Sequence, residues 1–232
     1  MLGIYFLILF VLILKSKIFA KIKIKWRSLL TIIDRAAEII KKGGVVIFPT
    51  ETLYGLGTNA LNQDAIKRIF EIKNRSIQKV LPVIIGDISQ LKMLVNRTDN
   101  MPLDLILDKF WPGPLSILFS GKTNLPKGVV NKEGYVCIRL TSHPIARDLC
   151  LCSGYPLVAT SANFSGKPSP RWFDEIDKGL LSKVDMAINL YPQPSGMKPS
   201  TIVKFVGYKT IQIIRQGAIS IDDLKKVGLD IK

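Results

Sequence analysis

Residues 44–57 read GVVIFPTETLYGLG and combine two local patterns that indicate the fold class. The run 45–48 is continuously apolar and mostly β-branched, which is typical of a short strand buried on both faces. Pro49 cannot donate to a sheet ladder, so we expect the strand to end there. Residues 49–57 are rich in hydroxyl groups and glycine, and they predict a loop at the end of this strand.

Helices are predicted on both sides of this stretch. Apolar residues recur at helical spacing over 29–40, and the glycine pair 43–44 ends that helix. Asn62 is expected to cap a second helix. Lys73 and Arg75 lie at the C-terminal end of that helix, where the helix dipole favours positive charge.

The rest of the chain mixes strands and helices over short connections. Amphipathic stretches occupy 88–95 and 103–110, and a helix is expected over 144–152, opened by a proline. Strands are expected at 81–85, 115–119, 135–140, 157–160, 187–190, 201–206 and 211–215. No repeat and no long linker interrupts this pattern, so it predicts one α/β domain.

The chain is basic, and the charge is unevenly distributed. Its 232 residues carry a formal net charge of +15. Residues 1–27 hold six basic side chains and no acid, so the remaining +9 belongs to the rest of the chain. A bias of this size favours polyanionic partners, namely nucleotides, nucleic acid or a membrane surface. Lysine enrichment that only keeps the protein soluble is the alternative.

The histidine and cysteine content excludes several classes of site. His143 is the only histidine in the sequence, which rules out sites that need two imidazoles, and no Ser-His-Asp set is evident. Cys137, Cys150 and Cys152 lack the spacing of a zinc site or of a disulfide framework. We therefore expect reduced thiols and no metal site built by the protein, with any Mg²⁺ held mainly by substrate phosphates.

Residues 1–27 are expected to form a separate extension. The thirteen apolar positions 2–14 are fewer than the ~20 that a membrane-spanning helix needs. The basic residues follow this stretch instead of preceding it, so a secretory signal is poorly supported. Two alternatives stay open: an anchor that dips into a membrane beside a basic flank, or a true start downstream of the stretch. Membrane association is expected only if residues 1–27 are present in the protein.

Two short polar motifs indicate a polyphosphate site. Lys73-Asn74-Arg75 closes a helix, and Ser161-Ala162-Asn163 follows an apolar strand. The chain has no Walker sequence and no GxGxxG, so phosphates would need fixed cations and small hydrogen-bonding side chains. The candidate cations are Lys73, Arg75, Arg139 and Arg215. The candidate neutral groups are Ser161, Asn163, Ser200 and Thr201.

Each of these motifs has a purely structural alternative. The first motif could be solvated charge at a helix C-terminus, and the second could satisfy local backbone groups. Thr50 and Thr52 could be turn hydroxyls, and Tyr54 could belong to the core. Arg139 is the more suggestive cation, because it directly follows an apolar strand whose end buries the stem and directs the charged head.

Together with further blocks, these motifs resemble the YrdC-like L-threonylcarbamoyladenylate synthases in their short, single-domain form. The matching blocks follow the family's order between 28 and 217, and they are 44–56, 72–75, 111–115, 137–139, 159–166, 199–203 and 214–217. The resemblance implies an open twisted mixed α/β sheet flanked by helices, with a basic concave face. It also implies a catalytic domain at 28–217 and a short C-terminal tail at 218–232. The chain departs from the family pattern at Ser76 and Ser142, where proline is usual.

The resemblance further implies a nucleotidyltransferase reaction in the cytoplasm. L-threonine, bicarbonate and ATP would give threonylcarbamoyl-AMP and pyrophosphate, the first step towards N6-threonylcarbamoyladenosine in tRNA. The downstream tRNA threonylcarbamoyl-transfer machinery would consume the product. The implied ATP contacts are Lys73, Arg75, Ser161, Asn163, Arg171, Ser200 and Arg215. The implied L-threonine contacts are Thr50, Thr52, Tyr54, Arg139 and Thr201.

A function of a different class remains as the alternative. The same basic concavity could bind tRNA or other double-stranded RNA without catalysis. Such a module predicts an affinity that falls steeply as salt rises, because RNA binding releases counterions. The synthase instead predicts release of pyrophosphate that depends on threonine and bicarbonate.

Overall fold

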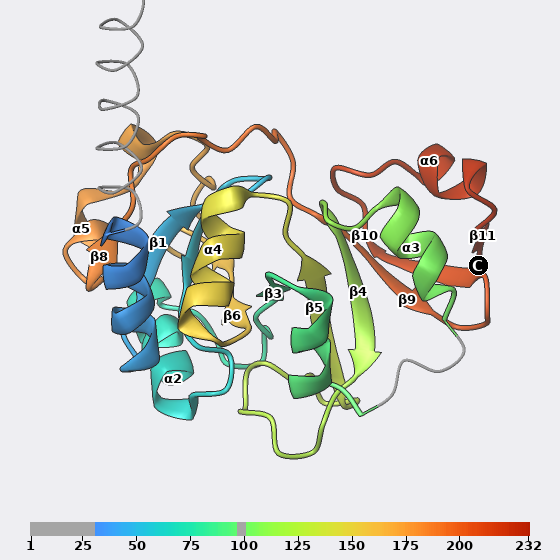
Figure 1. Cartoon of the computed structure of the whole chain (residues 1–232), viewed down its shortest axis with the longest axis horizontal. Coiled ribbons are helices and arrows are strands. Elements are labelled where there is room, and N and C mark those ends of the chain that lie inside the picture. Colours follow the sequence, from blue (N-terminus) through green and yellow to red (C-terminus); the bar gives the residue numbers. More distant parts are fainter. Residues whose placement is uncertain (1–30, 97–100) are drawn as a thin grey trace, which may run out of the picture.

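The computed structural model describes residues 31–96 and 101–232 (Figure 1). The predicted extension 1–27 lies outside these residues, so both of its alternatives stay predictions. Within the described part of the chain, no helix is long and apolar enough to cross a membrane.

Two mixed sheets form the framework (Figure 1). The four-stranded sheet has the order β7-β2-β1-β8, with β1 antiparallel to β2 and parallel to β8. Its strands are β1 Val46–Pro49, β2 Tyr54–Gly57, β7 Thr160–Ser161 and β8 Met186–Ala187. The seven-stranded sheet has the order β11-β10-β9-β4-β5-β3-β6. Its strands are β3 Val83–Ile85, β4 Leu115–Ser120, β5 Tyr135–Leu140, β6 Leu157–Val158, β9 Thr201–Phe205, β10 Thr210–Arg215 and β11 Asp230–Ile231.

Helices flank the sheets, so the predicted mixed α/β class is confirmed. A helix covers 31–41, and its end at Gly43 has the left-handed φ of +81° that glycine tolerates. The α-helices that follow are α2 Gln63–Lys73, α3 Leu103–Lys109, α4 Pro144–Ser153, α5 Lys178–Leu181 and α6 Ile221–Lys226. Two short 3₁₀ helices are η1 Ile88–Met93 and η2 Phe173–Glu175.

The predicted start of α2 is confirmed in atomic detail. The side chain of Asn62 accepts a hydrogen bond from the Ala65 N–H at 3.0 Å, which is the expected N-cap. At the other end, Asn74 adopts the left-handed conformation with φ 49° and stops the helix directly after Lys73. This turn sends the chain away from the helix axis at the first of the two polar motifs.

Strand β1 is buried on both faces, as its apolar run predicts. Ile47, together with Val45 just before the strand, belongs to the larger apolar core, to which strands of the seven-stranded sheet also contribute. Val46 and Phe48 belong to a second core formed with the helix 31–41 and α4. Burial on both sides fixes the end of β1, and therefore the loop that follows it.

The prediction of a loop throughout 49–57 is wrong, because β2 forms the second arm of a hairpin there. The buried side chains of Tyr54 and Leu56 alternate with glycines, which allow close packing. A Cβ on Gly57 would lie 2.2 Å from the backbone oxygen of Val158, so the strand needs glycine at that position. At this position glycine allows two backbone segments to approach closely, whereas the sequence pattern had predicted a loop.

Two other segments differ from the predicted elements. The expected strand 157–160 divides, because β6 joins the larger sheet and β7 joins the smaller one. The expected tail 218–232 folds into α6 and β11, and its Leu224 and Leu229 are buried. The strand expected at 187–190 is confined to β8, at Met186–Ala187.

Candidate active site

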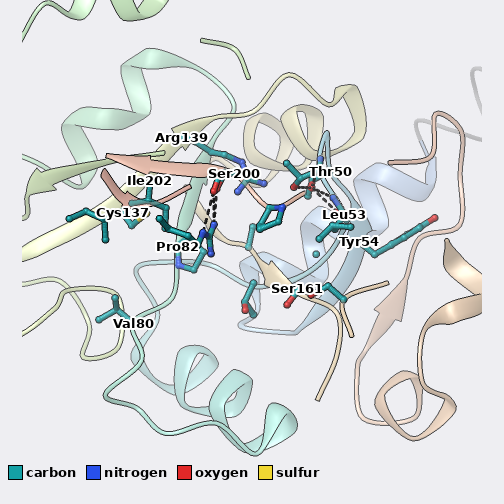
Figure 2. Close-up of a pocket in the computed structure, with 18 of the residues that line it drawn as sticks. Thr50, Leu53, Tyr54, Val80, Pro82, Cys137, Arg139, Ser161, Ser200 and Ile202 are labelled. Atoms are coloured by element: carbon teal, nitrogen blue, oxygen red, sulfur yellow. Dashed lines mark hydrogen bonds between the residues drawn. The ribbon is translucent and has the colours of Figure 1, made fainter. Parts of the chain in front are cut away.

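A cavity of about 460 Å³ opens between the two sheets (Figure 2). The hairpin β1–β2 and strand β7 contribute one wall, and β4, β5, β9 and β10 contribute the other. Eight of the predicted site residues line it: Thr50, Thr52, Tyr54, Arg75, Arg139, Ser161, Ser200 and Arg215. The lining, drawn entirely from described residues, contains three arginines and no aspartate or glutamate. The cavity is therefore suited to an anionic ligand.

Arg139 lies on β5 and reaches the cavity from the larger sheet. Its Nε donates to Glu51 Oε1 at 2.7 Å, and Thr141 Oγ1 donates to Glu51 Oε2 at 2.6 Å. The side chains of Arg139 and Glu51 are only 5% and 8% exposed. Burial by itself would raise the pKa of Glu51, but the Arg139 charge and the Thr141 hydrogen bond hold it below its usual value.

The hairpin loop contributes hydroxyl groups. Thr50 Oγ1 donates to the Leu53 carbonyl at 2.7 Å and lies 3.0 Å from Thr52 Oγ1, so these hydroxyls also stabilise the turn (Figure 2). The Tyr54 hydroxyl donates to Gln193 Oε1 at 2.6 Å, and burial raises the pKa of Tyr54 to about 12. The phenol therefore stays protonated at neutral pH.

Ser200 and Arg215 meet at the other side of the cavity. Arg215 donates to the Ser200 carbonyl through Nη2 at 2.8 Å and to Ser200 Oγ at 3.2 Å. Ser116 Oγ donates to Ser200 Oγ at 2.9 Å. Burial lowers the pKa of Arg215, and no carboxylate pairs with it in the described chain. Its charge is therefore available to a ligand.

Arg75 is the third arginine of the lining. Its Nε donates to the Lys79 carbonyl at 3.0 Å and its Nη2 to the Val80 carbonyl at 3.3 Å. These bonds hold the guanidinium at the edge of the cavity and leave its charge without a carboxylate partner among the described residues. Burial lowers its pKa.

Lys73 and Asn163 lie together beside Ser161 but do not themselves line the cavity. The Lys73 ammonium donates to the Ser161 carbonyl, to the Asn163 carbonyl at 2.5 Å and to Asn163 Oδ1 at 3.3 Å. Ser161 Oγ donates to the same Oδ1 at 2.5 Å. Lys73 is 1% exposed, and burial together with the Arg75 charge lowers its pKa to about 7. The two predicted motifs thus meet in space.

Two predicted residues lie apart from the cavity. Thr201 is fully buried, and its hydroxyl donates to the Ile219 carbonyl while accepting from the Gly217 and Ile219 N–H groups. Arg171 lines an adjoining cavity of about 400 Å³, and its guanidinium lies 4.9 Å from the Trp172 ring centroid. The two cavities share Leu53 and Ser169, so Arg171 borders the site without lining its main part.

A segment that the sequence did not mark as functional runs beside the site, from one sheet to the other. Residues 189–199, here called the strap, connect β8 of one sheet to β9 of the other (Figure 1). Within the strap, Gln193 accepts from Tyr54, the Pro192 carbonyl lies 3.0 Å from His143 Nε2, and the Gly196 N–H donates to the Glu51 carbonyl at 3.1 Å. No local periodicity distinguishes this segment.

Glu51 was missed as well, although the sequence contains a signal for it. It is the only charged residue between 45 and 63, in a run that is otherwise apolar, hydroxylated or amide-bearing. A single carboxylate among buried neighbours needs a positively charged partner. Arg139, which also directly follows an apolar run, was the natural candidate.

Titratable groups of the described chain form no cluster of three or more His, Cys, Asp or Glu that could hold a metal ion. Cys137 lines the cavity as a buried thiol, and burial raises its pKa to about 11. The groups that line the cavity and could act on a ligand are therefore positively charged arginines and neutral hydrogen-bonding side chains.

Comparisons with known proteins find relatives that cover most of the chain. Residues 38–217 match the sequence model of the Sua5/YciO/YrdC family, whose description reads "Telomere recombination". A relative from Methanocaldococcus jannaschii, named "Putative threonylcarbamoyl-AMP synthase", is 38% identical over 213 residues, which are 92% of this chain and 99% of that protein. The threonylcarbamoyl-AMP synthase of Pyrococcus abyssi is 33% identical over 197 residues, which are 85% of this chain and 57% of that longer protein.

A solved structure shows the same fold. The P. abyssi Sua5 structure, described as complexed with L-threonine, has a TM-score of 0.79 and 32% identity, over 86% of this chain and 58% of that one. The chain thus spans little more than half the length of this relative. The matched family model and the shared fold show that the chain belongs to the Sua5/YciO/YrdC family.

Proposed function

We propose that the protein forms L-threonylcarbamoyl-AMP and pyrophosphate from L-threonine, bicarbonate and ATP. The observation that carries this proposal is the cavity lining, with three arginines and no acid among its described residues. Relatives named threonylcarbamoyl-AMP synthase support it, and so does the description of the P. abyssi structure as a complex with L-threonine. The reaction class is then nucleotidyl transfer.

ATP binds, in this proposal, where the positive charge lacks carboxylate partners. Arg75 and Arg215 face the triphosphate, with Ser161 and Ser200 as neutral donors. Lys73 and Asn163 bond to Ser161 of this wall, and Lys73 adds positive charge near the departing pyrophosphate. Arg171 contacts the nucleotide from the adjoining cavity. The phosphates themselves hold the Mg²⁺ that accompanies ATP.

L-threonine binds on the opposite side. The Arg139 guanidinium donates to both oxygens of the amino-acid carboxylate in a bidentate arrangement, which the planar fork of arginine favours. Thr50, Thr52 and Tyr54 provide hydroxyl groups around the substrate. Thr201 acts indirectly, because its hydroxyl is occupied by the backbone near Gly217.

The chemistry needs no nucleophile from the protein. The threonine amine attacks bicarbonate, and loss of water gives a carbamate. A carbamate oxygen then attacks the α-phosphorus of ATP. The bond between this phosphorus and the oxygen that bridges the α- and β-phosphates breaks, and the β- and γ-phosphates leave as pyrophosphate with their negative charge near Arg75 and Lys73. Orientation and electrostatic stabilisation supply the acceleration.

We further propose that residues 28–217 are the catalytic domain and that the protein acts in the cytoplasm. The adenylate product passes to the tRNA threonylcarbamoyl-transfer machinery. Contact with tRNA is compatible with the charge of +9 outside residues 1–27.

Release of pyrophosphate tests the proposal. Wild-type protein is incubated with ATP, L-threonine and bicarbonate, and then with each omitted in turn. We expect release only with all three substrates. Salt-sensitive binding of tRNA without any pyrophosphate release would overturn the proposal in favour of an RNA-binding module.

A further inference from the structure

One carboxylate lies next to the cavity and has no part in the chemistry above. Glu51 stands in the hairpin between β1 and β2, and both of its carboxylate oxygens already accept hydrogen bonds, one from Arg139 and one from Thr141. A carboxylate engaged in this way is poorly placed to act as a base. Its partners point to a different role.

We propose that Glu51 is a positioning residue that directs the Arg139 guanidinium into the cavity and so sets the affinity for the amino-acid substrate. This inference rests on the proposed function, in which Arg139 binds the threonine carboxylate. Glu51 contacts Arg139 and not the substrate.

The donor arrangement of Arg139 supports this role. A guanidinium has five N–H donors in one plane. Glu51 takes the Nε edge at 2.7 Å, whereas Nη1 and Nη2 have no protein acceptor among residues 31–96 and 101–232. The Nη1/Nη2 edge of a residue that lines the cavity is thus left for a carboxylate ligand.

The pair also connects the two walls of the cavity. Glu51 belongs to the hairpin of the four-stranded sheet, and Arg139 belongs to β5 of the seven-stranded sheet. The Gly196 N–H of the strap donates to the Glu51 backbone carbonyl at 3.1 Å, which fixes Glu51 from a third direction. A side chain held so firmly pre-organises the arginine, and pre-organisation lowers the entropic cost of binding.

A merely structural role predicts something else. If the ion pair only joined the sheets, its loss would weaken the whole cavity and would affect L-threonine and ATP alike. A positioning role predicts a selective effect on L-threonine, because the ATP contacts Arg75 and Arg215 do not bond to Glu51.

The test compares KM values for L-threonine and ATP in the pyrophosphate-release assay. We expect Glu51→Ala to raise the threonine KM ~100-fold, as misplacement of a binding group by about 1 Å can do, with the ATP KM within about twofold of wild type. Glu51→Gln keeps an oxygen that can accept from Arg139 Nε, so we expect a rise of only ~10-fold or less. Thr141→Val removes one hydrogen-bond donor to Glu51, and we expect it to raise the threonine KM about threefold.

A matched control breaks a different ion pair, which joins Arg68 of α2 to Asp185 just before β8. Asp185 accepts from Arg68 Nη2 at 3.0 Å and from the Val45 N–H at 2.7 Å, away from the cavity lining. Asp185→Asn should leave both KM values unchanged. Should Glu51→Ala fail to fold, Glu51→Gln and Thr141→Val carry the comparison.

A double-mutant cycle completes the test. In a protein that already carries Arg139→Lys, adding Glu51→Ala should cause little further rise in the threonine KM, because both changes act through the same guanidinium. Equal rises in both KM values, or additive effects in the cycle, would overturn the positioning role. Calorimetric titration of wild type with L-threonine separates the two proposals: failure to bind would refute the proposed function, whereas binding that Glu51→Ala leaves intact would refute only this inference.

Discussion

Two buried cations lie close to the cavity, and the protein holds them in opposite ways. Lys73 is 1% exposed and donates to oxygens of Ser161 and Asn163, with no carboxylate beside it in the described chain. Arg139 is 4% exposed and pairs with the carboxylate of Glu51 at 2.7 Å. When protonated, the first cation is a net positive charge inside the protein, whereas the second is half of a neutral pair.

The difference shows which ligand each region suits. A buried charge without a counter-charge is costly, so the Lys73 region gains most from a polyanion such as a triphosphate. Its lowered pKa, about 7, reflects that cost. The charge of Arg139 is already neutralised by Glu51, so this region offers a ligand an oriented set of N–H donors and no net charge. That suits one carboxylate held in a fixed orientation.

Removing the uncompensated cation should have the largest effect on catalysis. We expect Lys73→Ala to lower kcat/KM by ~1000-fold, since a donor near developing charge is lost and the turn at Ser161 and Asn163 loses its support. Steady-state pyrophosphate release measures this. Lys67→Ala, an exposed lysine on the same helix, is the matched control and should retain wild-type activity.

Removing the compensated cation should act mainly on one substrate. We expect Arg139→Ala to raise the threonine KM ~100-fold with little change in the ATP KM. It should also lower the free energy of unfolding by about 3–5 kcal/mol, because Glu51 is left buried without its partner. Substrate titrations and urea denaturation measure the two effects. Equal losses of ATP and threonine affinity would remove the distinction between the two regions.

The pH dependence of stability should also distinguish the two regions. The folded-state pKa of Lys73 is about 7, whereas an unperturbed lysine titrates near 10.4, so the folded protein binds fewer protons between these values. The Lys73 contribution to stability should therefore rise as pH increases from about 7 to 10.4. Lys73→Met should lack this rise in stability. Urea denaturation of wild type and variant at several pH values measures the difference in their free energies of unfolding. A difference that does not vary over this range would contradict the lowered pKa.

Glu51 should respond at the opposite end of the pH scale. Its folded-state pKa lies below its ordinary value, so its contribution is present above the unfolded pKa of about 4.3 and is lost as pH falls through the folded pKa. Comparing acid unfolding of wild type and Glu51→Gln isolates this contribution. The variant should lose less stability than wild type over the acidic range.

The strap should have a smaller effect. A Cβ on Gly196 would lie 2.8 Å from the Glu51 carbonyl oxygen and 2.8 Å from Thr52 Cα, so Gly196→Ala must displace backbone. We expect a loss of about 1–3 kcal/mol in the free energy of unfolding and a rise in the threonine KM, because the shift reaches the Arg139 wall. Gly207→Ala, where the new Cβ meets only the Thr210 side chain at 3.3 Å, is the control. Thermal unfolding and threonine titration would show the difference.

Much of the fold could be predicted from local pattern. The apolar run of β5, the Asn62 cap and the proline that opens α4 are all local signals, and each is confirmed. Strand β2 was missed because its glycines and hydroxyls resemble a loop, whereas tertiary contact with Val158 determines their role. The division of 157–160 between two sheets depends on partners distant in sequence, which no local pattern reports.

The site could be predicted in part. The lining residues Arg75, Arg139, Ser161 and Arg215 were identified as candidates from charge and position at element ends. The partner of Arg139 was not, because Glu51 lies 88 residues away and only the fold brings the two together. The same holds for the strap, whose contacts with the hairpin arise from tertiary packing.

The central claim is tested most directly by identifying the product. Wild-type protein is incubated with ATP, L-threonine and isotopically labelled bicarbonate, and the nucleotide fraction is analysed by mass spectrometry. The account predicts threonylcarbamoyl-AMP that carries the bicarbonate label, formed in step with pyrophosphate. Release of pyrophosphate with only AMP or threonyl-AMP, or no turnover of ATP at all, would contradict it.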